Sequence, residues 1–227
     1  MAGWCNDRTA EIHDRRRPEV SHDQLVAAWR SPHAPGVVEH MKPDRYAITF
    51  FDPRDGRAPF DGMAALTYHD PGRAGTVTGR NTPEVVANDG WVDLVQLPME
   101  RLTVTENVIV AGPGSDPSIP ASADERNEAF KMTFLVSARP GVDPEAIQRH
   151  WLERHAPNVA SAFVAAGGVR YVVNLVDLSR GNQAYVGVAE LSYQDLAAAK
   201  AHHIADDGFN ALTTGIALPG RELVMVA

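Results

Sequence analysis

The chain has 227 residues, which is enough for one large domain or two small ones. Its 21 Lys and Arg against 29 Asp and Glu give a formal net charge of −8, so its charge does not favour binding to nucleic acid or to an anionic membrane. The single cysteine, Cys5, cannot form an internal disulfide, and no run approaches the roughly 18 apolar residues of a membrane span. The N-terminus has no apolar run typical of secretion, so the sequence predicts a soluble, cytoplasmic protein.

An internal repeat is the main organisational feature of the chain. The matched segments keep their order and nearly their spacing, as in 151 − 29 = 155 − 33 = 122. The matches are Trp29 with Trp151, His33-Ala34-Pro35 with His155-Ala156-Pro157, Arg45-Tyr46 with Arg170-Tyr171, and residues 60–68 with residues 185–193. Residues 111–128 are rich in Pro, Gly, Ser and Asp, which is typical of a linker. We therefore predict a first, diverged copy in residues 1–110 and a second copy in residues 129–227.

The elements of the second copy are expected in the order strand, helix, strand, strand, helix, strand. The expected strands are residues 131–138, 169–176, 185–193 and 222–226, and the expected helices begin at Asp143 and Asp195. Ile147, Trp151 and His155 recur every four residues and should share one face of the first helix, which Pro157 perturbs.

The first copy has less regular patterns. Residues 9–16, which should form its opening strand, are too polar for a central strand. Residues 70–79 contain one Pro and several Gly and predict a loop in place of the second helix, followed by a short helix at residues 83–87.

The order of elements, βαββαβ, is the ferredoxin-like pattern. Such a unit covers one face of its sheet with helices, and the other face must be buried elsewhere. We predict an α+β fold in which two ferredoxin-like repeats pack sheet-to-sheet as an intrachain dimeric α+β barrel around a cavity. Alternation along residues 187–191 places Gly187, Ala189 and Leu191 toward the helices and Val188 and Glu190 toward the enclosed space, with Met63 and Ala65 as equivalents in the first copy.

The motifs of the second copy resemble those of the EthD-domain family in the dimeric α/β-barrel superfamily. They are a Trp followed by His-Ala-Pro within residues 139–159, an Arg-Tyr…Asn strand at residues 170–174, and the strand YVGVAELSY at residues 185–193. The resemblance covers residues 131–227 well and residues 17–110 loosely, and implies tandem fused copies. Members of the superfamily include polyketide cyclases, dehydratases, decarboxylases, hydroxynitrile lyases, cofactor-free oxygenases and haem-binding enzymes, so the resemblance indicates a fold more than a reaction.

His155 is the first candidate for chemistry, with His33 as its counterpart. An imidazole beside an apolar cavity is suited to general acid/base catalysis, and the alternative is a structural ring bonded to a carbonyl near Pro157. Glu190 is expected either to exchange a proton or to pair with Arg170 or another cation. Asn174 is expected to orient a carbonyl or hydroxyl of the substrate.

Five further residues are predicted to contact the substrate. They are Trp151, Tyr171, Val188, Trp29 and Met63, although both tryptophans also fit a role in the core. The spacing of the nine histidines matches no zinc set, and the sequence has neither a phosphate-binding loop nor a nucleophile elbow. We therefore expect no metal and no other cofactor.

These features predict a cofactor-independent enzyme of the lyase, dehydratase, isomerase or cyclase type. Its partner should be a small hydrophobic carbonyl or hydroxyl compound, aromatic or polyketide-like, with neither nucleic acid nor membrane involved. The alternatives are a haem-binding or cofactor-free oxygenase of the same fold and a non-enzymatic ligand-binding protein of a catabolic pathway. Association into a homodimer is left open.

Overall fold

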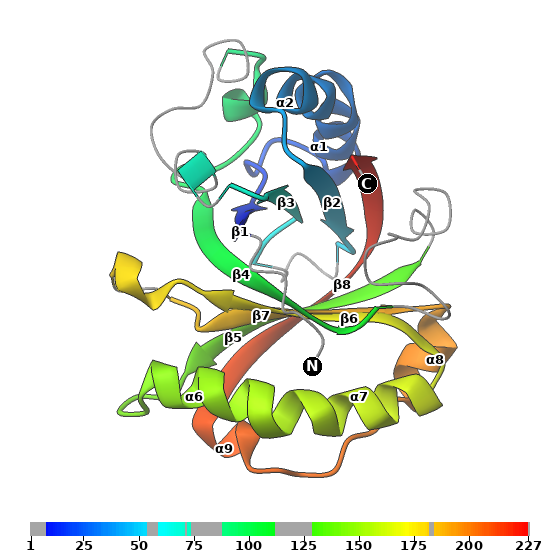
Figure 1. The fold of residues 1–227 in the computed structure, drawn as a ribbon. Coiled ribbons are helices and arrows are strands. Elements are labelled where there is room, and N and C mark those ends of the chain that lie inside the picture. The colour runs from blue at the N-terminus through cyan, green and yellow to red at the C-terminus, as the bar shows by residue number, and fades with distance from the viewer. Residues whose placement is uncertain are drawn as a thin grey trace. The chain divides into compact units, whose positions relative to one another are not determined.

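The computed structural model describes residues 8–53, 59–70, 72–73, 88–111, 129–181 and 184–226. Contacts divide the chain into two compact units (Figure 1). Unit 1 holds the described residues of 104–111 and 129–220, and unit 2 holds those of 8–103 and 221–226. None of the described helices has both the length and the apolar character needed to cross a membrane.

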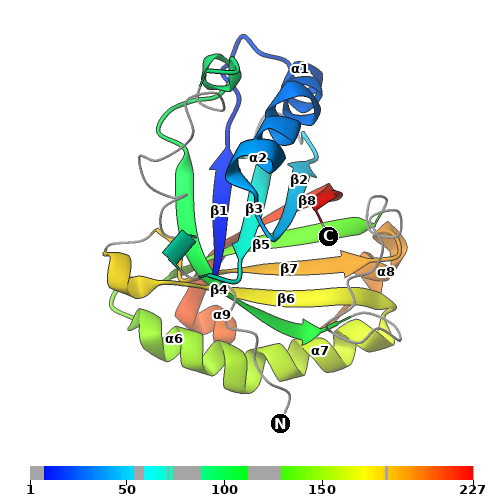
Figure 2. The same cartoon turned by 45° about the horizontal axis from the view of Figure 1, so that its top comes forward.

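The elements of unit 2 begin with strand β1, and the last of them, β4, continues into unit 1. They are β1 Arg8–Asp14, α1 His22–Ala28, the π-helical turn η1 Trp29–His33, α2 Ala34–Met41, β2 Arg45–Phe51, β3 Gly62–Tyr68, the 3₁₀ turn η2 Trp91–Asp93 and β4 Glu100–Val110. Helices α1 and α2 lie along one face of the sheet that contains β1, β3 and β2 (Figure 2).

The elements of unit 1 follow the same order, with a π-helical turn at the same place. They are β5 Phe130–Ala138, α6 Pro144–His150, η3 Trp151–His155, α7 Ala156–Ala165, β6 Gly168–Val176, η4 Leu178–Arg180, β7 Gly187–Tyr193, α8 Leu196–Ala201, α9 Phe209–Leu212 and β8 Thr213–Val226. Helices α6 and α7 lie along one face of the β5-β7-β6 sheet (Figure 1).

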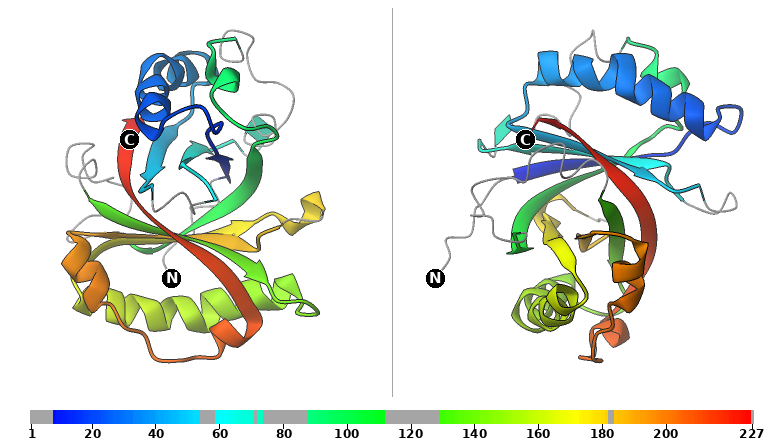
Figure 3. Two further views of the ribbon diagram at one scale, coloured as in Figure 1. Left: turned by 180° about the vertical axis from the view of Figure 1, so that it is seen from behind. Right: turned by 90° about the vertical axis from the view of Figure 1, so that its right-hand side faces the viewer.

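The strands are hydrogen-bonded in the order β1-β3-β2-β8-β5-β7-β6-β4, and this order closes into an eight-stranded barrel. The pairs β1–β3, β2–β3, β4–β6, β5–β7 and β6–β7 are antiparallel. Strands β4 and β8 each contribute to both units, and β8 is the long red strand in Figure 3. The predicted α+β barrel fold is thereby confirmed, while the domain boundaries at residues 110 and 129 stay a prediction.

Two expectations about strands were wrong. Residues 9–16 were expected to be too polar for a central strand, yet β1 pairs with β3 along its whole length. The reason is that the ladder to β3 provides partners for its backbone, while its last two side chains, His13 and Asp14, are buried. Strand β8 begins at Thr213 rather than at residue 222. Most of the expected linker, the expected helix at residues 83–87 and much of the expected loop at residues 70–79 lie outside the described residues.

The π-helical turn explains how a helix continues past the His-Ala-Pro motif. Proline has no backbone N–H and its ring clashes with a carbonyl one turn earlier, so an α-helix cannot pass through it unchanged. In unit 1 the turn η3 inserts before Pro157, which then occupies the first turn of α7. In unit 2 the turn η1 likewise precedes Pro35, but it is a kink between α1 and α2, because it contains Pro32 and Ser31 has extended backbone angles (φ −163°, ψ 120°). Both turns present a buried Trp and a His from the same short segment.

A glycine on the neighbouring strand makes room for each of these tryptophans. A Cβ atom at Gly187 would lie 2.8 Å from the Trp151 ring and 2.8 Å from the Asn174 carbonyl oxygen. A Cβ atom at Gly62 would lie 2.5 Å from the Trp29 ring. The repeated Trp therefore needs the repeated Gly, and Gly187 faces the helices as alternation along β7 predicted.

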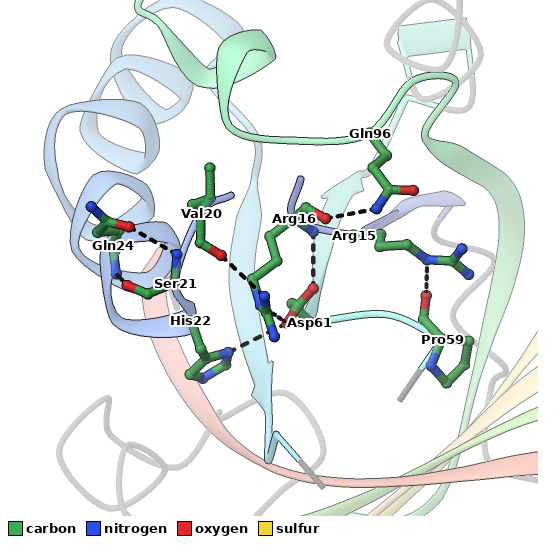
Figure 4. Close-up of polar contacts among 9 residues, drawn as sticks. All are labelled: Arg15, Arg16, Val20, Ser21, His22, Gln24, Pro59, Asp61 and Gln96. Carbon is green, nitrogen blue, oxygen red and sulfur yellow. Dashed lines mark hydrogen bonds and ion pairs between the residues drawn. The ribbon is translucent and has the colours of Figure 1, made fainter. Parts of the chain in front are cut away.

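Arg15 and Arg16, within the basic run at residues 15–17, anchor the chain just after β1 in unit 2 (Figure 4). The Arg16 backbone N–H and its Nε each donate to a carboxylate oxygen of Asp61 at 2.9 Å. The Arg16 side chain also donates to the Val20 carbonyl at 3.0 Å, while Gln96 donates to the Arg16 carbonyl at 2.8 Å. These bonds join the end of β1 to the start of β3, to the start of α1 and to the segment before β4, so Arg16 has a structural role.

Candidate active site

A cavity of about 430 Å³ lies in unit 1 between the helices and the sheet face that they cover. Its walls are mainly apolar. The lining residues are Phe134, Val136, Trp151, His155, Val159, Tyr171, Ala189, Leu191, His202, Ile204, Phe209, Asn210, Thr213, Thr214, Gly215 and Ala217. This size and this mixture of apolar walls with few polar groups are typical of sites for small organic molecules.

His155 borders this cavity and forms a pair with Asp207. Its Nδ1 lies 2.9 Å from Oδ2 of Asp207, and its side chain is 12% exposed. A carboxylate can only accept a hydrogen bond, so Nδ1 carries the proton of the neutral ring and Nε2 bears the lone pair. The pair therefore leaves Nε2 as the nitrogen that can exchange a proton with a ligand.

The Asp207 carboxylate is itself held in place. Asn158 donates to Oδ2 at 3.0 Å, and the Phe209 backbone N–H donates to Oδ1 at 3.1 Å. Burial alone would raise the pKa of Asp207, but the hydrogen bonds from Asn158, His155 and Phe209 lower it overall. Asp207 is therefore an anion at neutral pH, as an acceptor for His155 must be.

Stacking and burial set the state of the His155 ring. The ring lies parallel to Phe209, with centroids 4.0 Å apart and 12° between the planes. Burial lowers the pKa of His155 below its ordinary value, Asp207 opposes this effect, and His150 adds to it. The imidazole is therefore neutral at pH 7 and can accept a proton.

A second histidine, His202, lines the same cavity. Its Nδ1 lies 2.7 Å from the Tyr193 hydroxyl oxygen, and burial lowers its pKa. Burial raises the pKa of Tyr193, which keeps the hydroxyl protonated. Neither residue was predicted as part of a site from the sequence.

Unit 2 repeats the histidine pair of unit 1. Nδ1 of His33 lies 2.6 Å from Oδ2 of Asp89, and the ring is stacked on Trp91 with centroids 4.5 Å apart. The Trp91 backbone N–H donates to Oδ1 of Asp89 at 2.9 Å, as the Phe209 backbone N–H does to Oδ1 of Asp207. The signal that could have revealed the partners is a repeated Asp-Gly-aromatic motif at residues 89–91 and 207–209, where both glycines have positive φ.

Glu190 and Asn174 do not lie with His155. They project from the opposite face of the sheet, because Glu190 alternates with the cavity-lining residues Ala189 and Leu191 along β7. The Asn174 side-chain amide donates to Oε1 of Glu190 at 2.7 Å, and the Lys131 ammonium is paired with the other carboxylate oxygen. The prediction that His155, Glu190 and Asn174 form a single site was therefore wrong. Glu190 instead pairs with a cation, and that cation is Lys131 rather than Arg170.

The predicted substrate contacts are similarly divided. Trp151 and Tyr171 line the cavity of unit 1, and Trp29 occupies the position of Trp151 in the core of unit 2. Val188 is fully buried but lies on the sheet face away from the helices, and Met63 has the same position on β3. Among the described residues, no group of three or more His, Cys, Asp or Glu side chains is placed to hold a metal ion.

Comparisons with solved structures agree with the fold. An anthrone oxidase-like protein has a TM-score of 0.63 at 9% identity, over 96% of this chain and 91% of that one. A proposed monooxygenase from Fusobacterium nucleatum subsp. nucleatum has a TM-score of 0.54 at 11% identity, over 96% and 92%. A variant of the chlorite dismutase from Candidatus Nitrospira defluvii has a TM-score of 0.53 at 9% identity, over 96% and 91%. At these identities the similarity establishes the fold alone.

Comparison with known sequences finds similarity over a smaller part of the chain than comparison with solved structures. No curated protein matches it. Residues 139–212 match the family model of the EthD domain, and this segment contains His155, Asn158, Asp207 and Phe209. This segment of unit 1 is therefore similar to the EthD domain, as the motifs around Trp151 and His155 indicated.

Proposed function

We propose that unit 1 is an enzyme active site that performs acid/base chemistry without a cofactor on a small hydrophobic substrate. The reaction class is that of a lyase, dehydratase, isomerase or cyclase, and the substrate is an aromatic or polyketide-like compound with a carbonyl or hydroxyl group. The observation that carries the proposal is the His155–Asp207 pair at the wall of a largely apolar cavity. Cytoplasmic location belongs to the same proposal.

The proposed step is a proton transfer through His155. Nε2 takes a proton from an acidic C–H or O–H of the substrate, and the electron pair of that bond moves toward the neighbouring carbonyl or the leaving group. The positive charge formed on the imidazole is stabilised by the Asp207 carboxylate at 2.9 Å. The imidazolium then returns the proton to another atom of the intermediate or to a leaving oxygen. Glu190 and Asn174 take no part in this step, because they lie on the other sheet face.

The wall of the cavity supports the proposed substrate class. Phe134, Val136 and Leu191 offer apolar contact, while Trp151 and Tyr171 offer flat aromatic surface. A charged substrate would lose its hydration there without a matching counter-ion, so a neutral ring compound is preferred.

The test is turnover of a panel of aromatic and polyketide-like carbonyl compounds by the wild-type protein, His155→Ala and Asp207→Asn. We expect His155→Ala to lower kcat by about 10² to 10⁴. The matched control is His33→Ala, which removes the equivalent ring from unit 2 and should leave kcat unchanged. Full turnover by His155→Ala on a true substrate would contradict the assignment.

Cofactor-free oxygenation is the second candidate. It is favoured by the similar structures described as an anthrone oxidase-like protein and a proposed monooxygenase. In that case His155 would remove the substrate proton and the resulting carbanion would react with O₂. Oxygen consumption that depends on substrate and on His155 would favour this reaction over a lyase or cyclase. Titration with haem, followed by the absorption spectrum, tests the haem-binding alternative separately.

We also propose that the chain consists of two fused copies of one unit. The proposal is supported by the shared element order, the two His–Asp pairs and the two Trp–Gly contacts described above. The boundaries proposed for the copies remain residues 1–110 and 129–227.

A further inference from the structure

The two His–Asp pairs differ in one neighbouring side chain. In unit 1 the residue three positions after His155 is Asn158, and in unit 2 the residue three positions after His33 is Gly36. Both residues lie in the first turn of the helix that follows the π-helical turn. The shared pair, with its stacked aromatic ring, is therefore present in both units, but this helix position holds an amide in unit 1 and no side chain in unit 2.

Asn158 makes two contacts at the site through one nitrogen. Its Nδ2 donates to Oδ2 of Asp207 at 3.0 Å, which is the same oxygen that accepts from His155, and to the Ala205 carbonyl at 2.8 Å. The segment from His202 to Gly208 has no helical or strand hydrogen bonds of its own around Ala205. The amide thus fixes both the carboxylate and the backbone that carries it.

We propose that Asn158 is the positioning residue that makes His155, rather than His33, the working imidazole of the chain. The inference rests on the proposed function, and it adds a reason why unit 1 carries the chemistry. By holding Asp207 in one orientation, Asn158 keeps the proton of the neutral His155 ring on Nδ1 and the lone pair on Nε2. In unit 2, Gly36 has no side chain that could hold Asp89 in the same way.

Alternative readings of Asn158 are weaker. A purely structural role, in which Asn158 joins α7 to the segment before α9, would need only the bond to Ala205. The second bond reaches the same segment, but it goes to the carboxylate oxygen that also accepts from His155, so it holds the Asp207 side chain as well as the backbone. The bond to Asp207 also opposes rotation of the carboxylate. A general base such as His155 requires a partner that is held in one orientation.

The test is an NMR titration of the full chain labelled with ¹⁵N-histidine, which needs no substrate. The His155 signals are assigned by their loss in His155→Gln. In the wild-type protein we expect the neutral ring to be the Nδ1–H tautomer. In Asn158→Ala we expect a mixture with the Nε2–H tautomer and a fall of about half to one pH unit in the midpoint of its titration, because Asp207, which raises the pKa of His155, is held less firmly. His150 and His202 are followed in the same spectra, because His150 acts on the His155 ring and His202 borders the same cavity.

Two further variants make the result specific. Asn158→Gln keeps an amide donor and should retain more of the Nδ1–H tautomer than Asn158→Ala. Gly36→Asn is the matched control in unit 2, where a Cβ would meet no atom within 4 Å, and it should leave the His155 signals unchanged.

The outcomes separate this inference from the proposed function. An unchanged tautomer and midpoint in Asn158→Ala would overturn the positioning role, even if His155→Ala abolished turnover. Conversely, a changed tautomer would support the positioning role, even if no substrate in the panel were converted. If turnover is found, Asn158→Ala should lower kcat more than it changes KM, since Asn158 acts through Asp207 and does not line the cavity.

Discussion

Asp14 should make the stability of the protein fall as pH rises. It ends strand β1 opposite Gly62, on the sheet face that packs against Trp29. The residue is 2% exposed, and within the described residues its Oδ1 has no hydrogen-bond partner. Burial raises the pKa of this carboxyl to about 8, although Arg101 opposes the effect.

The direction of this pH dependence follows from the protonation of Asp14 in the folded and the unfolded chain. Below about pH 4 the Asp14 carboxyl is neutral in both states, so it does not make stability depend on pH. Between about pH 4 and pH 8 the unfolded chain has released this proton while the folded chain keeps it, so the free energy of unfolding falls as pH rises. A difference of about four pH units between the states corresponds to on the order of 5 kcal/mol across that window.

The perturbation is Asp14→Asn, which removes the titration and keeps the shape of the side chain. Urea unfolding at pH 4.5 and at pH 8.5 should show nearly equal stabilities for wild type and variant at the lower pH. At the higher pH the variant should be more stable by several kcal/mol. Asp93→Asn is the matched control, because Asp93 is exposed in the same unit. A difference between wild type and Asp14→Asn that stays constant over this pH range would refute the reasoning.

Two more predictions concern packing and a buried ion pair. Gly187→Ala should lower the thermal midpoint, at a cost of about 1–3 kcal/mol, because the added Cβ would lie 2.8 Å from the Trp151 ring. Gly36→Ala, where the Cβ would meet no atom within 4 Å, should be neutral or stabilising by up to about 1 kcal/mol. Equal midpoints for these two variants would contradict the close contact. Lys131→Met should lower the free energy of unfolding by about 3–5 kcal/mol, because it leaves Glu190 buried without its cation. The double variant Lys131→Met/Glu190→Leu should recover most of that loss. Urea unfolding measures both, and a double variant no more stable than the single one would show that the pair is needed for the fold.

The parts of the fold that could be predicted from the sequence are those that depend on local periodicity. Alternation along β7 correctly assigned Gly187 and Ala189 to the helix side, because side chains of a strand alternate wherever the strand is placed. Strand β1 could not be predicted in this way. Its polar composition argues against a central strand, and only its pairing with β3, some 50 residues away, determines its conformation.

In the candidate site, too, local motifs could be predicted from the sequence and long-range pairs could not. His155 could be singled out because its His-Ala-Pro motif is local and occurs twice. Asp207 lies 52 residues further along the chain; the repeated Asp-Gly-aromatic motif marks it in the sequence, but its pairing with His155 follows from the fold. Lys131 was missed for a similar reason, because its partner Glu190 lies on the neighbouring strand β7 and far along the chain. Long-range pairs of charged groups leave no spacing that a sequence pattern can detect.

Comparison of equivalent positions in the two units separates what the fold requires from what a site requires. The Trp–Gly contact and the histidine stacked on an aromatic ring occur in both units, so either unit could keep them for folding alone. Glu190 is replaced by Ala65 in unit 2, which shows that a sheet of this kind forms without a buried carboxylate at that position. Buried charge adds little to stability when it must first lose its hydration. Polar groups found in unit 1 and absent from the equivalent positions of unit 2 are therefore where function is best sought. Asn158 is such a group, because it binds the Asp207 carboxylate that pairs with His155, whereas Gly36 stands at its position in unit 2.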